Sequence, residues 1–253
     1  MNIFDTHAHY DDEAFNDDRY ELLDILPQNG IKYVINQSVN LETSRFSIEL
    51  AKKYPYIYAA VGIHPENIAE NENVNDVREL AKNEKVVAIG EIGLDYYYDS
   101  TNKDLQLKYF KAQLLLANDL NLPVVIHDRE AHKDTLDTLK SINVSNAGVI
   151  HCFSGSVEMA KELLKLGYYL GFDGPITFKN AKTALDVLKY APLDRILIET
   201  DSPYLTPAPF RGKRNNSMYL EYVINKISEI KGFSPEGIAN STMNNAKTLF
   251  KIK

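Results

Sequence analysis

The chain of 253 residues is predicted to fold as one (β/α)8 barrel, or TIM barrel, with an extra C-terminal helix, and to form a single domain over residues 1–253. The main observation is that short apolar runs alternate with stretches of helical periodicity along the whole chain, with no linker or low-complexity segment between them. Eight such runs occur, which is the number of strands in this barrel. An open, doubly wound α/β sheet is the alternative, although a G-x-G-x-x-G dinucleotide motif follows none of the runs.

Strands are expected where β-branched and other apolar residues cluster, near residues 2–7, 31–36, 57–63, 86–91, 123–127, 147–151, 168–172 and 195–199. Helices are expected near residues 17–28, 41–53, 74–83, 104–120, 130–141, 156–166, 180–190, 217–231 and 235–250. The helix over 104–120 has the clearest apolar stripe, formed by Leu105, Leu107, Phe110, Leu114, Leu115 and Leu116. Gly30 and Gly167 are expected to end helices in a left-handed conformation, and Ser234 with Pro235 is expected to begin one.

Composition and charge describe an ordinary globular chain, with 44% hydrophobic and 25% charged residues. A net charge of −7 argues against a protein that coats nucleic acid through a broad basic surface. It allows a polyanionic substrate, because bound divalent cations concentrate positive potential in one cleft. No apolar run approaches the roughly 20 residues that span a bilayer, and the N-terminus lacks a signal-peptide pattern. Cys152 is the single cysteine, so no internal disulfide can form, which fits a reducing compartment, and we expect a cytoplasmic protein. Neither a membrane nor an obligate protein partner is expected.

Residues that bind metals or transfer protons lie at the ends of six apolar runs. The histidines at these ends are His7, His9, His64, His127 and His151, whereas His132 falls early in a helix and is expected to be a surface residue. Every strand of a parallel barrel delivers its C-terminal end to the same face. The sequence therefore predicts one composite site, and the chain is interpreted as an enzyme.

The first pair of candidate ligands is His7 and His9. Two residues apart in a strand, they project to the same side and can hold one cation together. Asp5 has the same parity one step deeper, where its carboxylate could orient a ligand from behind.

The other candidate ligands come from later strands. Glu91 would point a carboxylate into the barrel, which is costly unless a cation or arginine neutralises it, and its two oxygens could bridge two metals. His127 and His151 would give a second metal its nitrogen ligands, and Asp201 would close the ring beside the first pair. Such a set suits Zn²⁺ or Mn²⁺, whereas Mg²⁺ prefers more oxygen ligands, so two divalent cations are expected with their identity open among Zn²⁺, Mg²⁺ and Mn²⁺.

Seven segments of the chain resemble the TatD-type metal-dependent hydrolases, a branch of the amidohydrolase superfamily. In the family's order they are residues 5–9, 62–65, 90–96, 126–129, 151–155, 199–205 and 211–215. The resemblance implies a TIM-barrel enzyme with a two-metal centre and deoxyribonuclease or related phosphodiesterase activity. It further implies that His7, His9, Glu91 and Asp201 hold one cation and that Glu91, His127 and His151 hold the other. The chain departs from the family pattern at Glu66-Asn67 and at Asn216-Ser217.

The expected reaction is hydrolysis of DNA or another phosphodiester by metal-activated hydroxide, working from strand ends. As a hypothesis, Asp201 accepts a proton from the attacking water, Glu91 lies between the metals, and His64 and Arg129 stabilise charge on the phosphate. A basic run in the loop after the last strand is expected to contact the phosphate backbone through Arg211, Lys213 and Arg214. Of the three tyrosines Tyr96, Tyr97 and Tyr98, which could stack on bases, at least two are expected to pack in the fold instead. Cys152 is expected to be a packing residue.

Two alternatives stay open. The same metal centre could hydrolyse a small amide, lactone or other ester, because its ligands activate water without specifying the electrophile. A non-catalytic metal-stabilised or nucleic-acid-binding protein is the weaker alternative, since structural zinc sites usually take ligands close together in sequence, whereas these come from five strands. Arg129 and the basic run favour a phosphate substrate.

Overall fold

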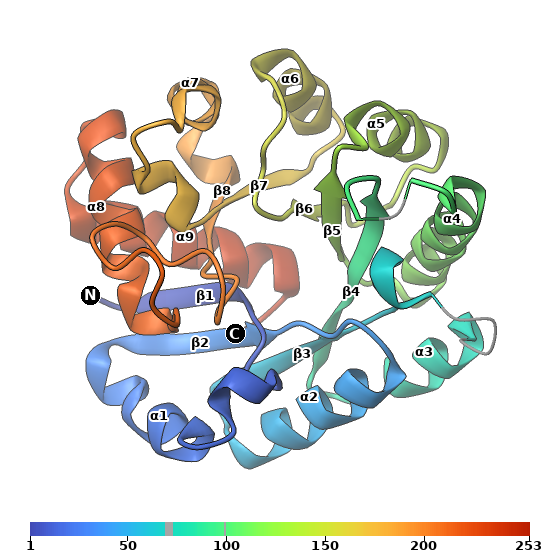
Figure 1. The fold of residues 1–253 in the computed structure, drawn as a ribbon, viewed down its shortest axis with the longest axis horizontal. Coiled ribbons are helices and arrows are strands. Elements are labelled where there is room, and N and C mark those ends of the chain that lie inside the picture. The colour runs from blue at the N-terminus through green and yellow to red at the C-terminus, as the bar shows by residue number, and fades with distance from the viewer. Residues whose placement is uncertain (69–72, 99) are drawn as a thin grey trace.

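Eight parallel strands form one sheet in chain order in the computed structural model, which describes residues 1–68, 73–98 and 100–253. The strands are β1 (Ile3–Ala8), β2 (Ile31–Asn36), β3 (Ile57–Val61), β4 (Val86–Asp95), β5 (Val124–Arg129), β6 (Gly148–Ile150), β7 (Tyr169–Phe172) and β8 (Ile196–Ile198). The sheet closes into a barrel because Ala8 bridges to Ser202 and the His9 N–H donates to the Ser202 carbonyl (Figure 1). The predicted TIM barrel is confirmed, and the doubly wound alternative is excluded by the unbroken strand order.

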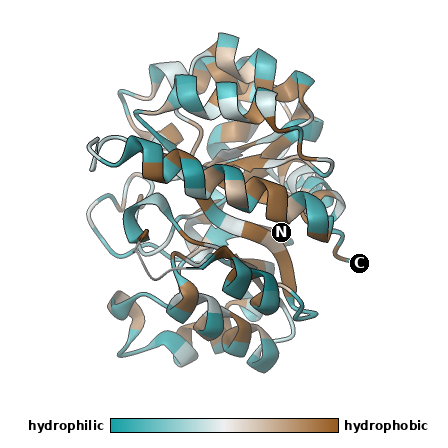
Figure 2. Ribbon diagram, turned by 90° about the vertical axis from the view of Figure 1, so that its right-hand side faces the viewer, coloured by the Kyte–Doolittle hydropathy of each residue, from teal (hydrophilic) through white to brown (hydrophobic). Residues whose placement is uncertain are grey.

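Helices surround the strands (Figure 1), and hydrophilic and hydrophobic residues alternate along them (Figure 2). In the described ranges they are α1 (Arg19–Ile25), α2 (Leu41–Lys53), α3 (Val74–Leu80), α4 (Lys103–Leu120), α5 (His132–Ser141), α6 (Val157–Lys165), α7 (Lys182–Tyr190), α8 (Leu220–Lys231) and α9 (Pro235–Phe250). The main hydrophobic core lies between these helices and the strands. None of the helices in the described part of the chain is both long and apolar enough to cross a bilayer.

A second hydrophobic cluster fills the barrel and closes one of its ends. It joins strand residues such as Phe4, Val125 and Leu197 to Leu249 and Phe250 of α9. With that end covered by α9, the opposite end, where the strands terminate, stays open, and it is the end at which TIM-barrel enzymes place their active sites.

The helix ends predicted from Gly30, Gly167 and Ser234 are confirmed. Gly30 and Gly167 have φ values of 91° and 89°, and the Ser234 side chain accepts the Gly237 N–H at the start of α9. The helix expected over 17–28 was wrong at its end, because a short 3-10 helix, η2 (Pro27–Asn29), replaces the last turn. Proline has no N–H to continue an α-helix. Leu115 was also assigned wrongly to the buried stripe of α4, since it is 54% exposed.

Strand β4 corrects the predicted position of Glu91. The sequence placed this residue at the strand's end, but β4 continues through Gly93 to Asp95. Gly93 has a φ of 147° and lies so close to β5 that a Cβ there would be 2.0 Å from the His127 carbonyl oxygen. The glycine, which looks like a strand terminator, therefore allows close pairing of β4 with β5 and extends the strand.

Candidate metal centre

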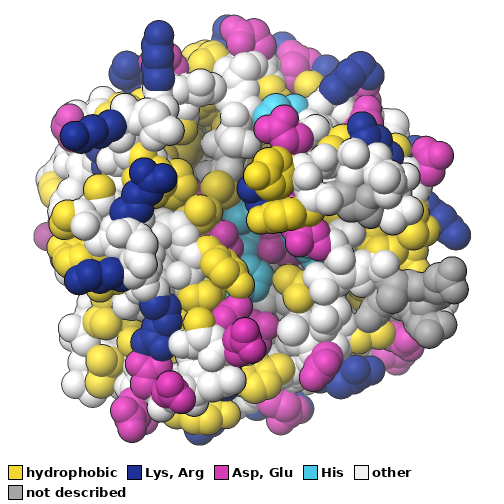
Figure 3. Space-filling model, in the orientation of Figure 1, with side chains coloured by type: hydrophobic (Ala, Val, Ile, Leu, Met, Phe, Trp, Pro, Cys, Tyr) yellow, Lys and Arg dark blue, Asp and Glu magenta, His cyan; other side chains and the backbone are white. Residues whose placement is uncertain are grey.

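A cavity of about 790 Å³ opens at the C-terminal ends of the strands, and histidines and carboxylates form its floor. Its lining includes His9, Glu91, His127, His151 and Asp201. Figure 3 shows the histidines at the bottom of a hollow near the middle of this face, with acidic side chains beside them. The structure thus brings together residues at the ends of β1, β4, β5 and β6 with Asp201 from the loop that follows β8.

The first group of possible ligand atoms surrounds one oxygen of Glu91. The Nε2 atoms of His7 and His9 are 3.1 Å apart. Glu91 Oε2 lies 3.3 and 3.6 Å from them, and Asp201 Oδ1 lies 3.5 and 3.4 Å from them, in the same order. Four ligands of a tetrahedral zinc ion lie about 3.3–3.4 Å from one another. The separations therefore fit a single cation held by these four atoms.

Asp201 is fixed in this position by the barrel closure. Its φ of 53° is in the left-handed region, which costs a non-glycine residue free energy. Its N–H donates to the His7 carbonyl oxygen at 2.9 Å, and the next residue, Ser202, accepts the His9 N–H. The backbone of His7 and His9 therefore also fixes the position of the Asp201 carboxylate.

The second group surrounds the other oxygen of Glu91. Glu91 Oε1 lies 2.9 Å from His127 Nδ1 and 3.2 Å from His151 Nε2. One carboxylate therefore faces two sets of nitrogen atoms, as a ligand shared by two cations would. Glu91 is only 3% exposed, so an unneutralised charge there would be costly.

His64 also approaches the second group but is arranged as a hydrogen-bond donor. Its Nδ1 accepts the Glu66 N–H at 3.2 Å, which leaves the proton of the neutral ring on Nε2. Nε2 lies 3.7 Å from Glu91 Oε1. Burial and the nearby His127 lower the pKa of His64 to about 3, so the ring is neutral at physiological pH. An N–H that faces the cavity suits a phosphate oxygen better than a metal ion.

The close contacts between carboxylates and histidines lower the pKa of Glu91 and raise the pKa values of His9 and His127. Burial opposes the charge of Glu91, but His151, His7 and His64 hold its pKa well below the usual range. Burial likewise opposes protonation of His9 and His127, but hydrogen bonds to Asp201 in the first case, and to Asp95 and Glu91 in the second, raise each pKa to about 9. Metal ligands must be unprotonated, so a cation that binds near neutral pH has to displace these protons.

The metal-free protein is therefore expected to lose thermal stability as the pH rises from 6.5 to 9. The pKa values of His9 and His127 rise from the ordinary histidine value of 6.5 to about 9 in the folded protein. Their protonation stabilises the folded state fully below 6.5, and this contribution is lost as the pH rises through 9. A bound cation replaces the protons and should remove the decline. The measurement is Tm at both pH values, with chelator and with Mn²⁺; parallel declines in the two series would contradict the expectation.

Two carboxylates that the sequence did not single out hold the histidines in place. Asp95 Oδ2 lies 3.0 Å from His127 Nε2, and Asp95 Oδ1 accepts the N–H groups of Tyr97 and Tyr98. Glu199 Oε1 accepts the Cys152 N–H and lies 3.4 Å from His151 Nδ1. Such partners orient metal-binding imidazoles. The signal that could have identified them is their position in the strand-end segments around Glu91 and Asp201.

Gly171 leaves room for the Glu199 carboxylate, and α4 holds the backbone of Asp95. A Cβ at Gly171 would come within 2.5 Å of the Glu199 carboxylate, so only glycine leaves room there. Gln106 of α4 accepts the Asp95 N–H and donates to the Asp95 carbonyl oxygen, both at 2.9 Å. Gln113 does the same for Ile63, immediately before His64, at 2.8 and 3.0 Å. Helix α4 thus anchors two cavity-forming strand ends through buried amides.

Asp5 lies behind the first group as expected, but its carboxylate binds backbone N–H and hydroxyl groups and not a histidine ring. Its carboxylate accepts the His7 N–H, the Thr200 N–H and hydroxyl, and the Ser217 hydroxyl. It therefore ties the end of β1 to the segment after β8 and to η6 (Ser217–Tyr219). Burial, opposed by these hydrogen bonds, raises the pKa of Asp5 to about 7.

The Asp95→Asn variant is expected to bind divalent cation about 10- to 100-fold more weakly, because an uncharged amide is a weaker hydrogen-bond acceptor for His127 Nε2 than the carboxylate that fixes the ring. Titration of metal-free protein with Mn²⁺ or Zn²⁺ measures the affinity. Asp134→Asn is the matched control, since its carboxylate pairs with the Tyr96 hydroxyl instead of a histidine. Wild-type affinity in Asp95→Asn would show that Asp95 does not position the ligand.

The remaining candidates for substrate contact lie in different places. Arg129 lines the cavity and stacks on Tyr97 and Tyr98, with its guanidinium carbon 4.1 and 4.6 Å from the ring centroids. These two tyrosines are 61% and 63% exposed, so the expectation that at least two of the three tyrosines pack in the fold was wrong. Tyr96 alone of the three is partly buried, with its hydroxyl bonded to Asp134.

The basic run after β8 is not part of the cavity's lining. Arg214 pairs with both carboxylate oxygens of Asp18, at 2.7 and 2.6 Å. Lys213 and Arg214 line a separate open hollow, and Arg211 lies over the Phe178 ring. The structure therefore separates these residues from the histidines.

Two further residues are placed as follows. Cys152 lines the cavity but belongs to none of the ligand groups formed by described residues. His132 is on the surface, and its Nδ1 lies 2.9 Å from Asp128 Oδ2.

Comparison with known proteins gives matches over nearly the whole chain. Residues 4–251 match the family model described as TatD related DNase. The chain is 44% identical to YabD of Bacillus subtilis, an uncharacterized metal-dependent hydrolase, over 99% of each chain. It is 37% identical to YcfH of Escherichia coli, also an uncharacterized metal-dependent hydrolase, over 100% of this chain and 97% of the relative. A crystal structure of YjjV, a TatD homologue from Escherichia coli, matches with a TM-score of 0.93 and 32% identity, over 99% of this chain and 98% of that one.

Proposed function

The chain belongs to the TatD-related DNase family of metal-dependent hydrolases, and from that premise we propose that it hydrolyses phosphodiester bonds of DNA, working from strand ends. The observation that carries the proposal is the position of Glu91, whose two oxygens face two separate sets of histidine nitrogens. Two-metal sites of this kind act on phosphodiesters in many nucleases. When bound, the cations supply Lewis acidity toward the phosphate and bring the pKa of a water near neutrality.

Three side chains of the cavity would accept the proton of the water and bind the phosphate. Asp201, on the cavity floor, accepts the proton of the attacking water. His64 offers its Nε2–H, and Arg129 offers a planar guanidinium held against two tyrosine rings, to the non-bridging oxygens of the phosphate. Arg129 favours a phosphate over an uncharged ester or amide.

A longer DNA strand would continue from the cavity over the neighbouring hollow. The two hollows share Asp12 and Tyr204, and Lys213 and Arg214 line the second. We include Lys213 and the exposed Arg211 as contacts to the phosphate backbone. Arg214 contributes through its charge, because its donors already bind Asp18.

The test is an assay of metal-reconstituted protein on end-labelled single- and double-stranded DNA, beside bis(p-nitrophenyl) phosphate, simple amides and lactones. Release of nucleotides that chelator abolishes and added cation restores would support the proposal. Hydrolysis confined to amides or lactones would reject it in favour of a carbon-centred substrate, and metal binding without turnover of any of these would reject hydrolysis of DNA.

A further inference from the structure

A cationic surface lies beside the mouth of the catalytic cavity, on the loops that follow β7 and β8. Residues 174–184 and 202–220 contain no Asp or Glu, whereas the whole chain has 35 acidic residues against 28 Lys and Arg. The cationic residues of these two segments are Lys179, Lys182, Arg211, Lys213 and Arg214. Among the described residues, Arg214 is the only one of these that pairs with a carboxylate, that of Asp18. The charge is therefore reversed locally, and the other cations lack a carboxylate partner within the described ranges.

The two loops form one continuous surface because they pack against each other. The Thr177 hydroxyl oxygen accepts the Ala208 N–H at 2.9 Å. The guanidinium carbon of Arg211 lies 4.5 Å from the centroid of the Phe178 ring. The two lysines of the first loop follow this ring within a few residues of the chain, so they extend the surface that the arginine begins.

The cationic surface begins at the catalytic cavity and leads away from it. Tyr204 and Leu205, from the loop after β8, line the cavity, and Lys213 of the same loop lines the adjoining hollow. The cations without a carboxylate partner are exposed, and Figure 3 shows Lys and Arg side chains gathered on the left of this face, beside the central hollow. The surface ends at α7, which begins at Lys182 without a capping side chain, so the N–H groups of its first turn add positive potential.

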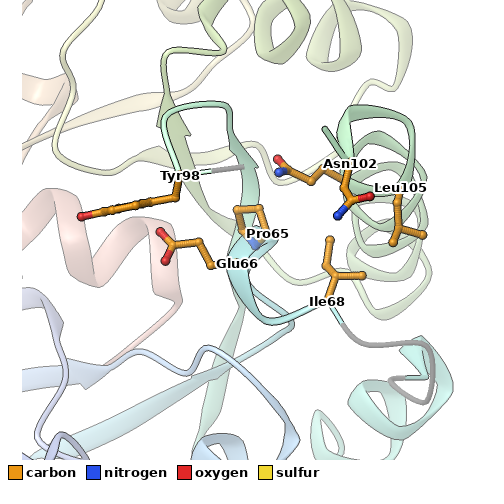
Figure 4. Close-up of a pocket in the computed structure, with 7 residues that line it drawn as sticks. Pro65, Glu66, Ile68, Tyr98, Asn102 and Leu105 are labelled. Carbon is orange, nitrogen blue, oxygen red and sulfur yellow. The ribbon is translucent and has the colours of Figure 1, made fainter. Parts of the chain in front are cut away.

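The opposite wall of the cavity is less suited to a phosphate backbone. Glu66 and Tyr98 form part of it, and they also line a small pocket of about 190 Å³ next to α4. Figure 4 shows the Glu66 carboxylate and the Tyr98 ring close together and both directed away from α4. Arg129, the cation on this wall, is assigned above to the phosphate that is attacked. A carboxylate repels further phosphates, so a strand in the cavity is expected to leave it over the loops after β7 and β8.

The partner that fits the cationic surface is a polyanion with repeated charges. Exposed lysines and arginines that gather in one place repel one another, and a phosphate backbone offsets this repulsion. A mononucleotide in the cavity would leave these residues without a partner. A strand whose end lies in the cavity carries further phosphates outside it, so one molecule can occupy both places.

We propose that Lys179 and Lys182 extend the contact surface of Arg211 and Lys213 and bind backbone phosphates of the substrate strand several nucleotides from the bond that is cut. The proposal rests on the function proposed above. It makes the protein selective for long strands, because each neutralised phosphate releases counterions and adds affinity that a dinucleotide cannot gain. The preference for long strands should therefore weaken as the salt concentration rises.

The experiment compares kcat/KM for dTpdT and for an oligo(dT) of about 12 nucleotides, at salt concentrations of about 50 and about 200 mM. The wild-type protein should prefer the oligomer, and more strongly at the lower salt concentration. The double variant Lys179→Gln/Lys182→Gln should lose at least about tenfold in kcat/KM on the oligomer at the lower salt concentration, as expected for two phosphate contacts. Its kcat/KM on dTpdT should stay at the wild-type value. Lys108→Gln/Lys111→Gln is the matched control, because these lysines are exposed on α4, on the other side of the barrel, and it should behave as the wild type.

A full wild-type preference for the oligomer in Lys179→Gln/Lys182→Gln would overturn the proposal, and so would an equal loss in the control variant, which would reflect net charge alone. An equal loss on dTpdT and on the oligomer would also overturn it, because the lysines would then act on the site of cleavage and not on the distant strand. These results leave the nuclease proposal standing, since each of them requires hydrolysis of the oligomer. Hydrolysis of bis(p-nitrophenyl) phosphate by wild-type protein without hydrolysis of dTpdT or the oligomer would instead overturn the nuclease proposal. Circular dichroism verifies the fold of both variants.

Discussion

The Glu91→Gln variant is expected to lose bound cation and to hydrolyse DNA at least about 1,000-fold more slowly, which corresponds to the several kcal/mol that metal ions contribute to the transition state. Glu91 Oε2 completes the group of His7, His9 and Asp201, and Glu91 Oε1 lies 2.9 and 3.2 Å from the nitrogens of His127 and His151. Replacing the carboxylate by a neutral amide removes a ligand from both groups at once. Among the described residues, Glu91 and His7 each belong to two of the three groups of possible ligands, and only Glu91 offers a separate oxygen to each of its groups.

The measurement combines elemental analysis of the purified variant with the DNA assay, and circular dichroism verifies the fold. Glu199→Gln is the matched control, because Glu199 is equally buried but lies behind His151 at 3.4 Å. It should weaken cation binding by about 10- to 100-fold, and saturating metal should restore its turnover. Near-normal metal content and turnover in Glu91→Gln would show that the carboxylate is not the shared ligand.

Asp201→Asn is expected to reduce turnover by at least about 100-fold, the usual contribution of a positioned proton acceptor. The amide keeps the size and hydrogen-bonding capacity of the side chain, but it cannot take the proton of the attacking water. Its carbonyl oxygen can still face the Nε2 atoms of His7 and His9, from which Asp201 Oδ1 is 3.5 and 3.4 Å. The loss should therefore appear in kcat at metal concentrations that saturate the site.

Metal content must be measured on the same sample, since a loss of cation would produce the same fall in rate. Asp12→Asn is the control: this carboxylate lines the same cavity, but it accepts the Tyr204 hydroxyl at 2.6 Å. It should leave turnover close to that of the wild type. Near-normal turnover of Asp201→Asn with metal bound would reject the proposed role.

The barrel and the convergence of its histidines were accessible from local patterns. Eight apolar runs separated by helical stretches define the strand number, and parallel strands in chain order can only present their ends on one face. Side-chain parity in a strand depends on neighbouring residues alone, so His7 and His9 could be placed side by side before any contact was known. The family resemblance inferred from seven short segments is confirmed by the match over residues 4–251.

Supporting residues were missed because their partners are remote or look ordinary in sequence. Gln106 and Gln113 lie on the buried face of α4, where the pattern predicts apolar residues, and their amides bind the backbone at Asp95 and Ile63. The bonds of Asp95 to His127 and of Arg214 to Asp18 also join segments far apart in the chain.

The sequence by itself determined the fold class and the set of side chains at the mouth of the barrel, because periodicity, parity and strand order are properties of short segments. Only the tertiary structure decided which atom of each side chain faces which partner: Glu91 Oε2 toward His7 and His9, Glu91 Oε1 toward His127, and His64 as a donor. It also decided that Tyr97 and Tyr98 stay exposed beneath Arg129. Distances of 3 to 4 Å between distant segments depend on how helices, glycines and closing loops pack together, and that packing is a property of the whole chain.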